Sequence, residues 1–281
     1  MFKRYYHCFV AGLYDLTFDE KKNLVSPEQF REELKTALHP KDHKLAEMLF
    51  LPYDNNNLIA YLTGEENEYE SLGNYSVEDF DEQVSRLNSI VPVKDNLPEY
   101  MVKVIVKWLD DEKEIDPVVA EKMLTEGYYE MVINSKNRFL RRWYEYQLNF
   151  NNIFALRNSQ ELGVDAADQI VGSNDLAHEL RAVSRRKGET RVPPEPDYAT
   201  ELFTIATETS FIERELKSDM TRWEYINDLI FFEYFTIDYI LGYTTKLLIA
   251  DRWRKLDRET GEKVLLKLVS ELKEVKVEEE A

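Results

Sequence analysis

Histidines are the first residues of this sequence whose type and spacing could do chemistry. The chain has four, and His39 and His43 stand four positions apart, a spacing that can hold a metal ion on one face of a helix. Pro40 lies between them, so a continuous helix through both is disfavoured. No cysteine or acidic partner stands at an obvious zinc-binding spacing from this pair. We therefore expect surface or helix-capping roles for these histidines, and no metal site.

Cys8 is the single cysteine, so an intramolecular disulfide is excluded, which fits a reducing compartment. A reactive thiolate needs an electropositive surrounding. The neighbours of Cys8 are mostly aromatic, and only Arg4 and His7 are close to it in sequence. We expect a buried, structural thiol.

Carboxylates are abundant in the second half of the chain and raise the question of a helical metal site. Such sites combine Glu with Glu-x-x-His pairs, and no Glu-x-x-His occurs in these segments. We expect most of these acids on solvated faces, paired with Lys or Arg: Glu145, Glu213, Glu215, Asp219, Glu224, Asp228, Glu233 and Asp238. Three of them lie in an apolar stretch and are expected to be partly buried: Asp228, Glu233 and Asp238. Their candidate partners are Arg157, Arg252 and Arg254.

Signature motifs of catalysis are missing from the sequence: HExxH, GxSxG, the Walker A motif and GxGxxG do not occur. We therefore expect no catalytic residue, no bound cofactor and no enzymatic activity. An enzyme with a carboxylate-lined pocket stays open as an alternative.

A basic segment stands out in an acidic chain. The run from Arg181 to Arg191 reads RAVSRRKGETR and carries a net charge of +4, against −18 for the whole chain. One interpretation is a solvated loop. The other is a docking patch for an acidic partner or lipid head groups, formed by Arg181, Arg185, Arg186, Lys187 and Arg191.

The composition predicts an all-α protein. Hydrophobic residues make up 43% of 281 residues, enough for a packed core. Gly and Pro number only 9 each, and sheet proteins need many tight turns. The negative charge repels phosphate backbones and excludes nucleic acid as a general partner.

Local sequence signals predict several helices in the first half of the chain. Ser26 and Pro27 form an N-cap signal for a helix that ends before His39. Residues 4–14 could be strand or helix, because so short a run shows no clear period. Further helices are predicted over about 41–50, 56–63, 77–88 and 97–109.

The second half is more strongly patterned. Phe139, Trp143, Tyr146, Phe150 and Ile153 form an apolar stripe in a long helical block over about 117–162. Short helices are predicted at about 165–171 and 174–183, followed by an exposed loop at 181–197 with Pro193, Pro194 and Pro196. One long helix, or two joined near 233–236, should cover about 198–257, and a final amphipathic helix should lie near 264–272.

We expect a single helical domain over 1–281, with possible sub-blocks at 1–115 and 116–275. The most apolar region, Leu229 to Ala250, carries Glu233, Asp238 and Lys246 and falls short of the roughly 20 apolar residues of a transmembrane helix. The first residues lack the apolar core of a signal peptide. We therefore expect a cytoplasmic protein without a transmembrane segment.

Several segments carry a family resemblance. Residues 143–157 read WYEYQLNFNNIFALR and residues 243–252 read YTTKLLIADR. Both resemble helices of the C (also called d) subunits of V-type and A-type rotary ATPases. The segments YYHCFVAGL (5–13), FREEL (30–34) and LPYDN (51–55) are similar to a short bacterial branch encoded with V-type ATPase operons. The chain is shorter than most members of that family, and Asp251 stands where the family is expected to have Glu.

The resemblance implies cross-packed helical bundles in a reduced three-lobed funnel. It implies a non-catalytic central-stalk subunit that couples the shaft to the membrane rotor ring. The implied partners are shaft subunits and that ring, with the protein held peripherally on the inner face of the membrane. The alternative outside this family is a free-standing helical adaptor with an unrelated partner.

Overall fold

A computed structural model of the chain describes residues 4–18, 25–65, 69–87, 96–110, 115–185 and 196–255. All regular structure in these ranges is α-helical, which confirms the all-α prediction. The ambiguous N-terminal segment is a short helix, α1 (His7–Ala11). The expected helix near 264–272 lies outside the described residues.

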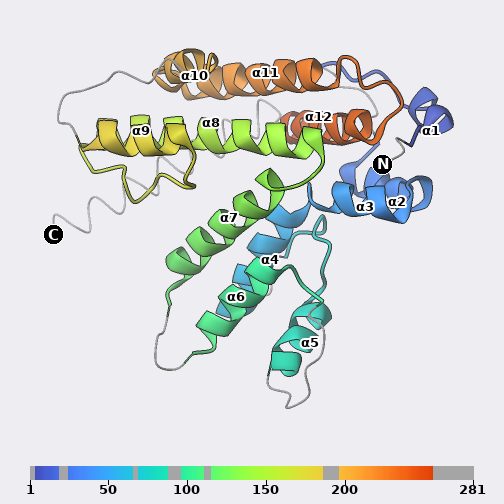
Figure 1. Cartoon of the computed structure of the whole chain (residues 1–281), viewed down its shortest axis with the longest axis horizontal. Coiled ribbons are helices and arrows are strands. Elements are labelled where there is room, and N and C mark those ends of the chain that lie inside the picture. The colour runs from blue at the N-terminus through green and yellow to red at the C-terminus, as the bar shows by residue number, and fades with distance from the viewer. Residues whose placement is uncertain are drawn as a thin grey trace.

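The described helices form two bodies, a slab and a leg that projects from one side of it (Figure 1). The leg contains α4 (Leu51–Thr63), α5 (Val77–Leu87), α6 (Glu99–Trp108) and α7 (Pro117–Ile133). The slab contains α1, α2 (Pro27–Ala37), α3 (Pro40–Glu47), α8 (Arg138–Leu162), α9 (Asp175–Ser184), α10 (Ala199–Ala206), α11 (Phe211–Ile230) and α12 (Ile237–Lys255). The resemblance implied three lobes, and this arrangement has a slab and a leg.

Side-chain caps set the starts of many helices. The Ser26 hydroxyl accepts a hydrogen bond from the backbone N–H of Gln29 at 3.2 Å, as the N-cap signal predicted. Asn137 caps α8 through the N–H of Leu140 (2.8 Å), and Asn174 caps α9 through that of Ala177 (2.9 Å). These caps satisfy N–H groups that a helix start otherwise leaves unpaired.

Three predicted boundaries were wrong. α4 begins at Leu51, because Pro52 sits in its first turn, where no N–H is needed. Residues 165–171 form turns and not a helix. In the region 198–257 the alternative break near 233–236 is confirmed, since α11 ends at Ile230 and α12 begins at Ile237. A second break before α11, whose N-cap is Ser210, was not predicted and separates α10 from it.

α8 is the central helix, and it contacts α7, α9, α10, α11 and α12. Its predicted apolar stripe is confirmed, since every member is buried: Phe139, Trp143, Tyr146, Phe150 and Ile153. The core is one continuous cluster that runs from Leu16 to Ala250. Packing also crosses the expected boundary at 115, because α7 packs on α4 and α6 as well as on α8, and α12 packs on α2 and α3.

Candidate functional site

A charged groove lies where the leg meets the slab. It has a volume of about 470 Å³, and its walls come from α4 and residues 70–72 on one side and from α8, α11 and α12 on the other. Its polar lining includes Glu70, Gln147, Asp219, Arg222, Asp251 and Arg252. We call it the junction groove.

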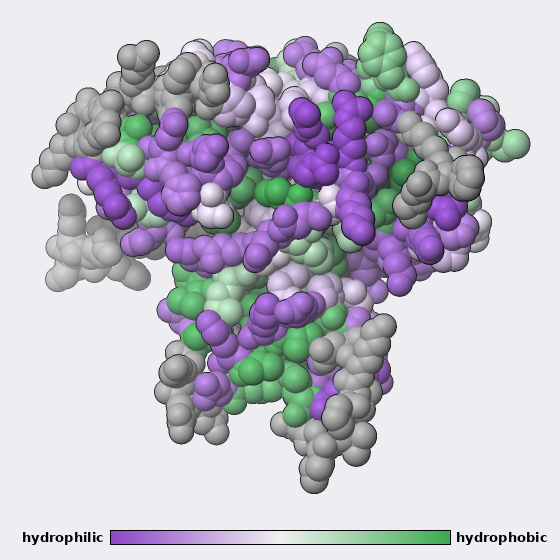
Figure 2. Space-filling model, in the orientation of Figure 1, coloured by the Kyte–Doolittle hydropathy of each residue, from purple (hydrophilic) through white to green (hydrophobic). Residues whose placement is uncertain are grey.

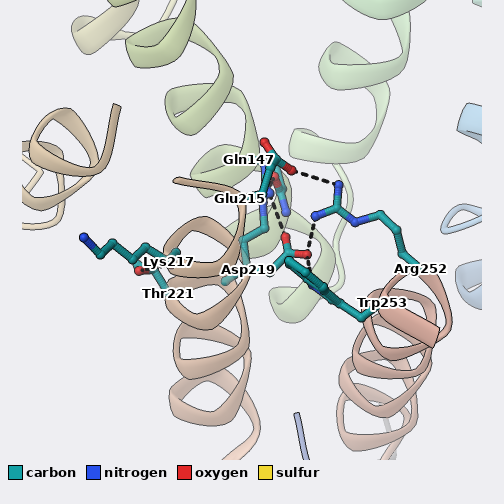
Figure 3. Close-up of polar contacts among 8 residues, drawn as sticks. Gln147, Glu215, Lys217, Asp219, Thr221, Arg252 and Trp253 are labelled. Atoms are coloured by element: carbon teal, nitrogen blue, oxygen red, sulfur yellow. Dashed lines mark hydrogen bonds and ion pairs between the residues drawn. The ribbon is translucent and has the colours of Figure 1, made fainter. Parts of the chain in front are cut away.

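Asp219 is the centre of the charge network in this groove. Its side chain is 2% exposed, yet both oxygens are fully engaged. Arg222 Nη1 donates to Asp219 Oδ1 at 2.9 Å, and Trp253 Nε1 donates to Asp219 Oδ2 at 2.7 Å. Arg252 donates to the same Oδ2 from α12, so side chains of two helices converge on one carboxylate (Figure 3). A buried carboxylate is tolerated only with such partners.

The two arginines extend the network to further helices. Arg222 Nε donates to Gln147 Oε1 of α8 at 3.3 Å, and its guanidinium lies 3.8 Å from the ring centroid of Phe150. Arg252 Nη1 also pairs with Glu215 Oε2 at 3.2 Å. Burial lowers the pKa of Arg252, but its pairing with Asp219 and Glu215 outweighs this and raises it. The network therefore joins α8, α11 and α12 through fixed charges.

Asp251 is the second buried acid of the groove. Its partners are Arg254 and Lys255, the latter with Nζ at 2.8 Å from Oδ2. Both belong to the last turn of α12, so this acid organises the end of its own helix. Chemically, the junction groove is a set of compensated ion pairs that can fix the relative positions of helices.

The acids singled out from sequence are distributed differently from the prediction. Asp228 is exposed, so its expected burial was wrong, because it lies on the outer face of α11. Glu233 and Asp238 are partly buried as predicted, but with other partners: Arg138 at 3.5 Å and Asn137 Nδ2 at 2.5 Å.

The predicted arginine partners serve other acids. Arg157 pairs with Glu161 at 2.8 Å. Arg252 pairs with Asp219, and Arg254 pairs with Asp251. Sequence reasoning placed Asp219 on a solvated face, and this was wrong. A signal for its burial exists in the sequence: Ile230, Ile226, Trp223 and Asp219 recur at spacings of four, three and four, so Asp219 falls on the buried stripe of α11.

The remaining candidates have structural contacts. His39 Nδ1 accepts the N–H of Lys41 at 3.2 Å, which confirms a capping role, and His43 Nδ1 lies 3.4 Å from Glu47 Oε1. Cys8 is exposed, so its predicted burial was wrong; α1 has no buried residue. In the ranges that the structure covers, no cluster of His, Cys, Asp or Glu is suited to hold a metal ion.

Only part of the basic segment lies within the described residues. Arg181 Nη2 donates to the carbonyls of Ile170 (2.7 Å) and Gly172 (2.8 Å), so this side chain holds the 165–172 turns against α9. Arg185 is exposed at the end of α9. Arg186, Lys187 and Arg191, together with most of the expected loop, lie outside the described residues.

Residues of the resemblance segments act as internal ties. Asp54 is fully buried and accepts from Asn74 Nδ2 (2.6 Å) and from the N–H of Tyr75 (2.9 Å). Burial raises the pKa of Asp54 to about 6. Asn57 exchanges two hydrogen bonds with the backbone of Glu70, at 3.0 and 2.6 Å. Asp54 of the LPYDN segment and Asn57, two residues beyond that segment, thus fasten residues 70–75 to α4.

The asparagines of the 143–157 segment have the same kind of role. Asn152 exchanges two hydrogen bonds with the backbone of Val171, both at 2.8 Å. Asn149 Oδ1 accepts from Asn174, and Asn149 Nδ2 donates to the Tyr198 hydroxyl, also at 2.8 Å. Buried amides satisfied in this way hold irregular chain segments onto α8.

Exposed apolar side chains form several groups, two of which lie where one helix ends and the next begins. The leg tip comprises Val106, Leu109, Val118 and Val119. The aromatic knuckle is the turn between α11 and α12, where Phe231, Phe232 and Tyr234 are exposed. Phe235 ends this turn at φ 59°, an uncommon conformation for a side chain of this size, and its carbonyl accepts the N–H of Tyr6 at 2.7 Å. Figure 1 places the leg tip and the knuckle at different extremities of the molecule.

No described helix combines the length and the apolar character needed to cross a membrane. Neither a curated protein nor a solved structure matches the chain significantly. Residues 1–276 match the family model described as "Protein of unknown function (DUF2764)". The match spans nearly the whole chain, and the protein therefore belongs to the DUF2764 family.

Proposed function

We propose that this chain is a non-catalytic central-stalk subunit of a V-type rotary ATPase, which couples the shaft to the membrane rotor ring. The proposal is supported by the position, in the fold, of residues from the segments that resemble this family. Tyr6, Asp54, Asn149 and Asn152 fasten loops, turns and neighbouring helices to one another. The likeness to this family of stalk proteins therefore lies in the residues that organise the fold.

A torque-transmitting spacer needs a stiff body. The ion pairs and hydrogen bonds of the junction groove hold α8, α11 and α12 together within the slab. Buried tyrosines connect the leg to the slab. Tyr128 of α7 donates to the Met48 carbonyl at 3.0 Å, which ties the leg to the segment after α3. Tyr144 of α8 meets Tyr128 edge-on at a centroid distance of 5.2 Å. Dense packing of this kind transmits strain.

Such a spacer also needs two separate docking surfaces. The leg tip and the aromatic knuckle are two apolar sites on different extremities, as a protein between a shaft and a ring would require. Exposed aromatic side chains are favoured anchors of protein interfaces. A net charge of −18 favours basic partner surfaces. In this proposal the protein is cytoplasmic and reaches the membrane through the ATPase.

The test is affinity capture of the N-terminally tagged chain from detergent-solubilised membranes of its native cells. We expect rotor-ring and shaft subunits in the eluate, and recovery of neither would overturn the proposal. Phe232→Ser should reduce recovery of one of these partners, while Tyr14→Ser, which also removes an exposed ring, should leave recovery unchanged. Capture of an unrelated partner with no ATPase subunit would favour the free-standing adaptor.

A further inference from the structure

The periodic stripe of α11 runs from a buried part into an exposed part. Ile230, Ile226, Trp223 and Asp219 are all at most 8% exposed. The same alternation of four and three residues leads on to Leu216 and Ile212. These two side chains are 37% and 62% exposed. Such periodicity marks a helix face that meets a neighbour along its whole length.

An exposed ridge accompanies this end of α11. Met220 is 45% exposed and lies one turn beyond Leu216, which itself lies one turn beyond Ile212. Residues four apart lie on the same side of a helix, so the three side chains form one apolar ridge. We call Ile212, Leu216 and Met220 the α11 ridge.

α12 covers the stripe in an antiparallel register that ends at the ridge. Near one end, a Cβ added at Gly242 would lie 2.5 Å from Ile230 Cγ2. Near the other end, Trp253 Nε1 lies 2.7 Å from Asp219 Oδ2. Both pairs belong to the same register, since α12 advances eleven residues while α11 recedes by eleven. The same sum of residue numbers would pair Leu216 with position 256 and Ile212 with position 260, both outside the described residues.

The last described turn of α12 lies beside the exposed end of the stripe. α12 is described to Lys255, and the sequence continues with Leu256. After Gly261 it carries apolar residues at helical spacing: Val264, Leu265, Leu268, Val269 and Leu272. The ridge from 212 to 220 corresponds to about 12 Å of helix at about 1.5 Å per residue, and the sequence stretch 264–272 has the same number of residues.

We propose that residues 256–272 cover the α11 ridge, with Leu256 on Leu216 and the apolar side chains of 264–272 returned across Ile212 and Met220. Gly261 supplies the reversal, because glycine adopts turn conformations without steric cost. The cover removes from water both the apolar ridge and the apolar side chains of an amphipathic segment. This inference is independent of the rotary-ATPase proposal.

Hydrogen exchange of the full chain tests the cover. The variant Leu265→Asp/Leu268→Asp/Leu272→Asp removes the apolar side chains, and the control Lys267→Asp/Ser270→Asp/Lys273→Asp changes polar positions between them. In the apolar variant, amides 215–220 should exchange at least about tenfold faster than in the wild type, because local opening becomes easier. The control should match the wild type at these amides, and α8 should be unchanged in both. Equal protection of 215–220 in all three proteins would overturn the proposal.

Cross-linking identifies the occupant and tests the register. In a Cys8→Ser background, Leu216→Cys with Leu256→Cys should form a disulfide within one chain under mild oxidation, whereas Leu216→Cys with Val277→Cys should not. A cross-link found mainly between two chains, with a dimer in sedimentation, would show that a second copy covers the ridge and would overturn the proposal. Failure of the 216–256 pair to link within or between chains would overturn the register.

Discussion

The slab and the leg each bury a carboxylate, and the partners of the two carboxylates differ in charge. In the slab, Asp219 is met by the guanidinium groups of Arg222 and Arg252 and by the Trp253 indole. In the leg, Asp54 is held by the neutral groups of Asn74 and Tyr75. The slab thus uses charge to lock helices together, whereas the leg uses a titratable acid to fasten a loop.

The surfaces of the two bodies differ as well. On the face shown in Figure 2, hydrophobic residues cover much of the leg, and hydrophilic residues dominate the slab. The leg tip continues this apolar character through Val118 and its neighbours. The slab is thus stabilised by internal polar ties, and the leg projects from it as a more apolar extension.

The largest effect should follow from removing the charge centre of the slab. Asp219→Ala leaves Arg222 and Arg252 without their buried counter-charge, and we expect a loss of about 3 kcal/mol in the free energy of unfolding. Urea denaturation measures it. Glu224→Ala on the exposed face of α11 is the control, with a change within about 0.5 kcal/mol. A loss below about 1 kcal/mol for Asp219→Ala would show that the network is dispensable.

Two glycines allow a matched steric test of leg against slab. At Gly127 an added Cβ would lie 2.5 Å from Tyr100 Cβ, and at Gly242 it would lie 2.5 Å from Ile230 Cγ2. A Cβ next to the backbone cannot move away, whereas a terminal methyl can. We therefore expect Gly127→Ala to destabilise by about 2 kcal/mol and Gly242→Ala by about 1 kcal/mol. Thermal denaturation measures both losses. A larger loss for Gly242→Ala than for Gly127→Ala would contradict this explanation.

The pH dependence of stability should distinguish the two carboxylates. The pKa of Asp54 is raised from 3.8 to about 6 in the folded protein, so the folded state binds this proton more tightly than the unfolded state. Its contribution therefore grows as pH falls through about 6, by about 1 kcal/mol between pH 7 and pH 5. Denaturation at both pH values should show this gain in the wild type relative to Asp54→Asn. If the free energy of unfolding changed equally with pH in both proteins, the pKa of Asp54 would not be raised in the folded state.

The smallest change in stability should come from the docking surfaces. Val118→Ser at the leg tip and Phe232→Ser at the knuckle remove exposed side chains, so each should alter the free energy of unfolding by less than about 0.5 kcal/mol. Both should nevertheless weaken partner capture. A larger loss of stability in either variant would show that the replaced side chain contributes to the core. It would contradict the assignment of that surface to docking.

Local signals in the sequence predicted much of the fold. The cap at Ser26, the stop at Gly163 and the stripe of α8 depend on neighbouring residues along one helix, so they could be read without tertiary contacts. The functional candidates were harder to predict. Asp219 and Asp228 stand nine residues apart on α11, and one is buried while the other is exposed. Asp219 lies among polar residues in the sequence and Asp228 lies in an apolar stretch, so local composition predicted the reverse. The spacing from Trp223, Ile226 and Ile230 places Asp219 on the buried stripe of α11.

The sequence by itself determined the helical class, most helix ends and the apolar stripes, because backbone caps and side-chain periodicity act over a few residues. Only the tertiary structure decided that α4–α7 form a leg, that Asp54 is buried, that Arg252 and Trp253 meet Asp219, and that Arg181 binds backbone carbonyls. These outcomes depend on which helix faces meet, through contacts between residues far apart in the chain, such as Arg252 with Asp219. Periodicity along a single helix cannot specify its partner, and the free energy of packing the whole chain does.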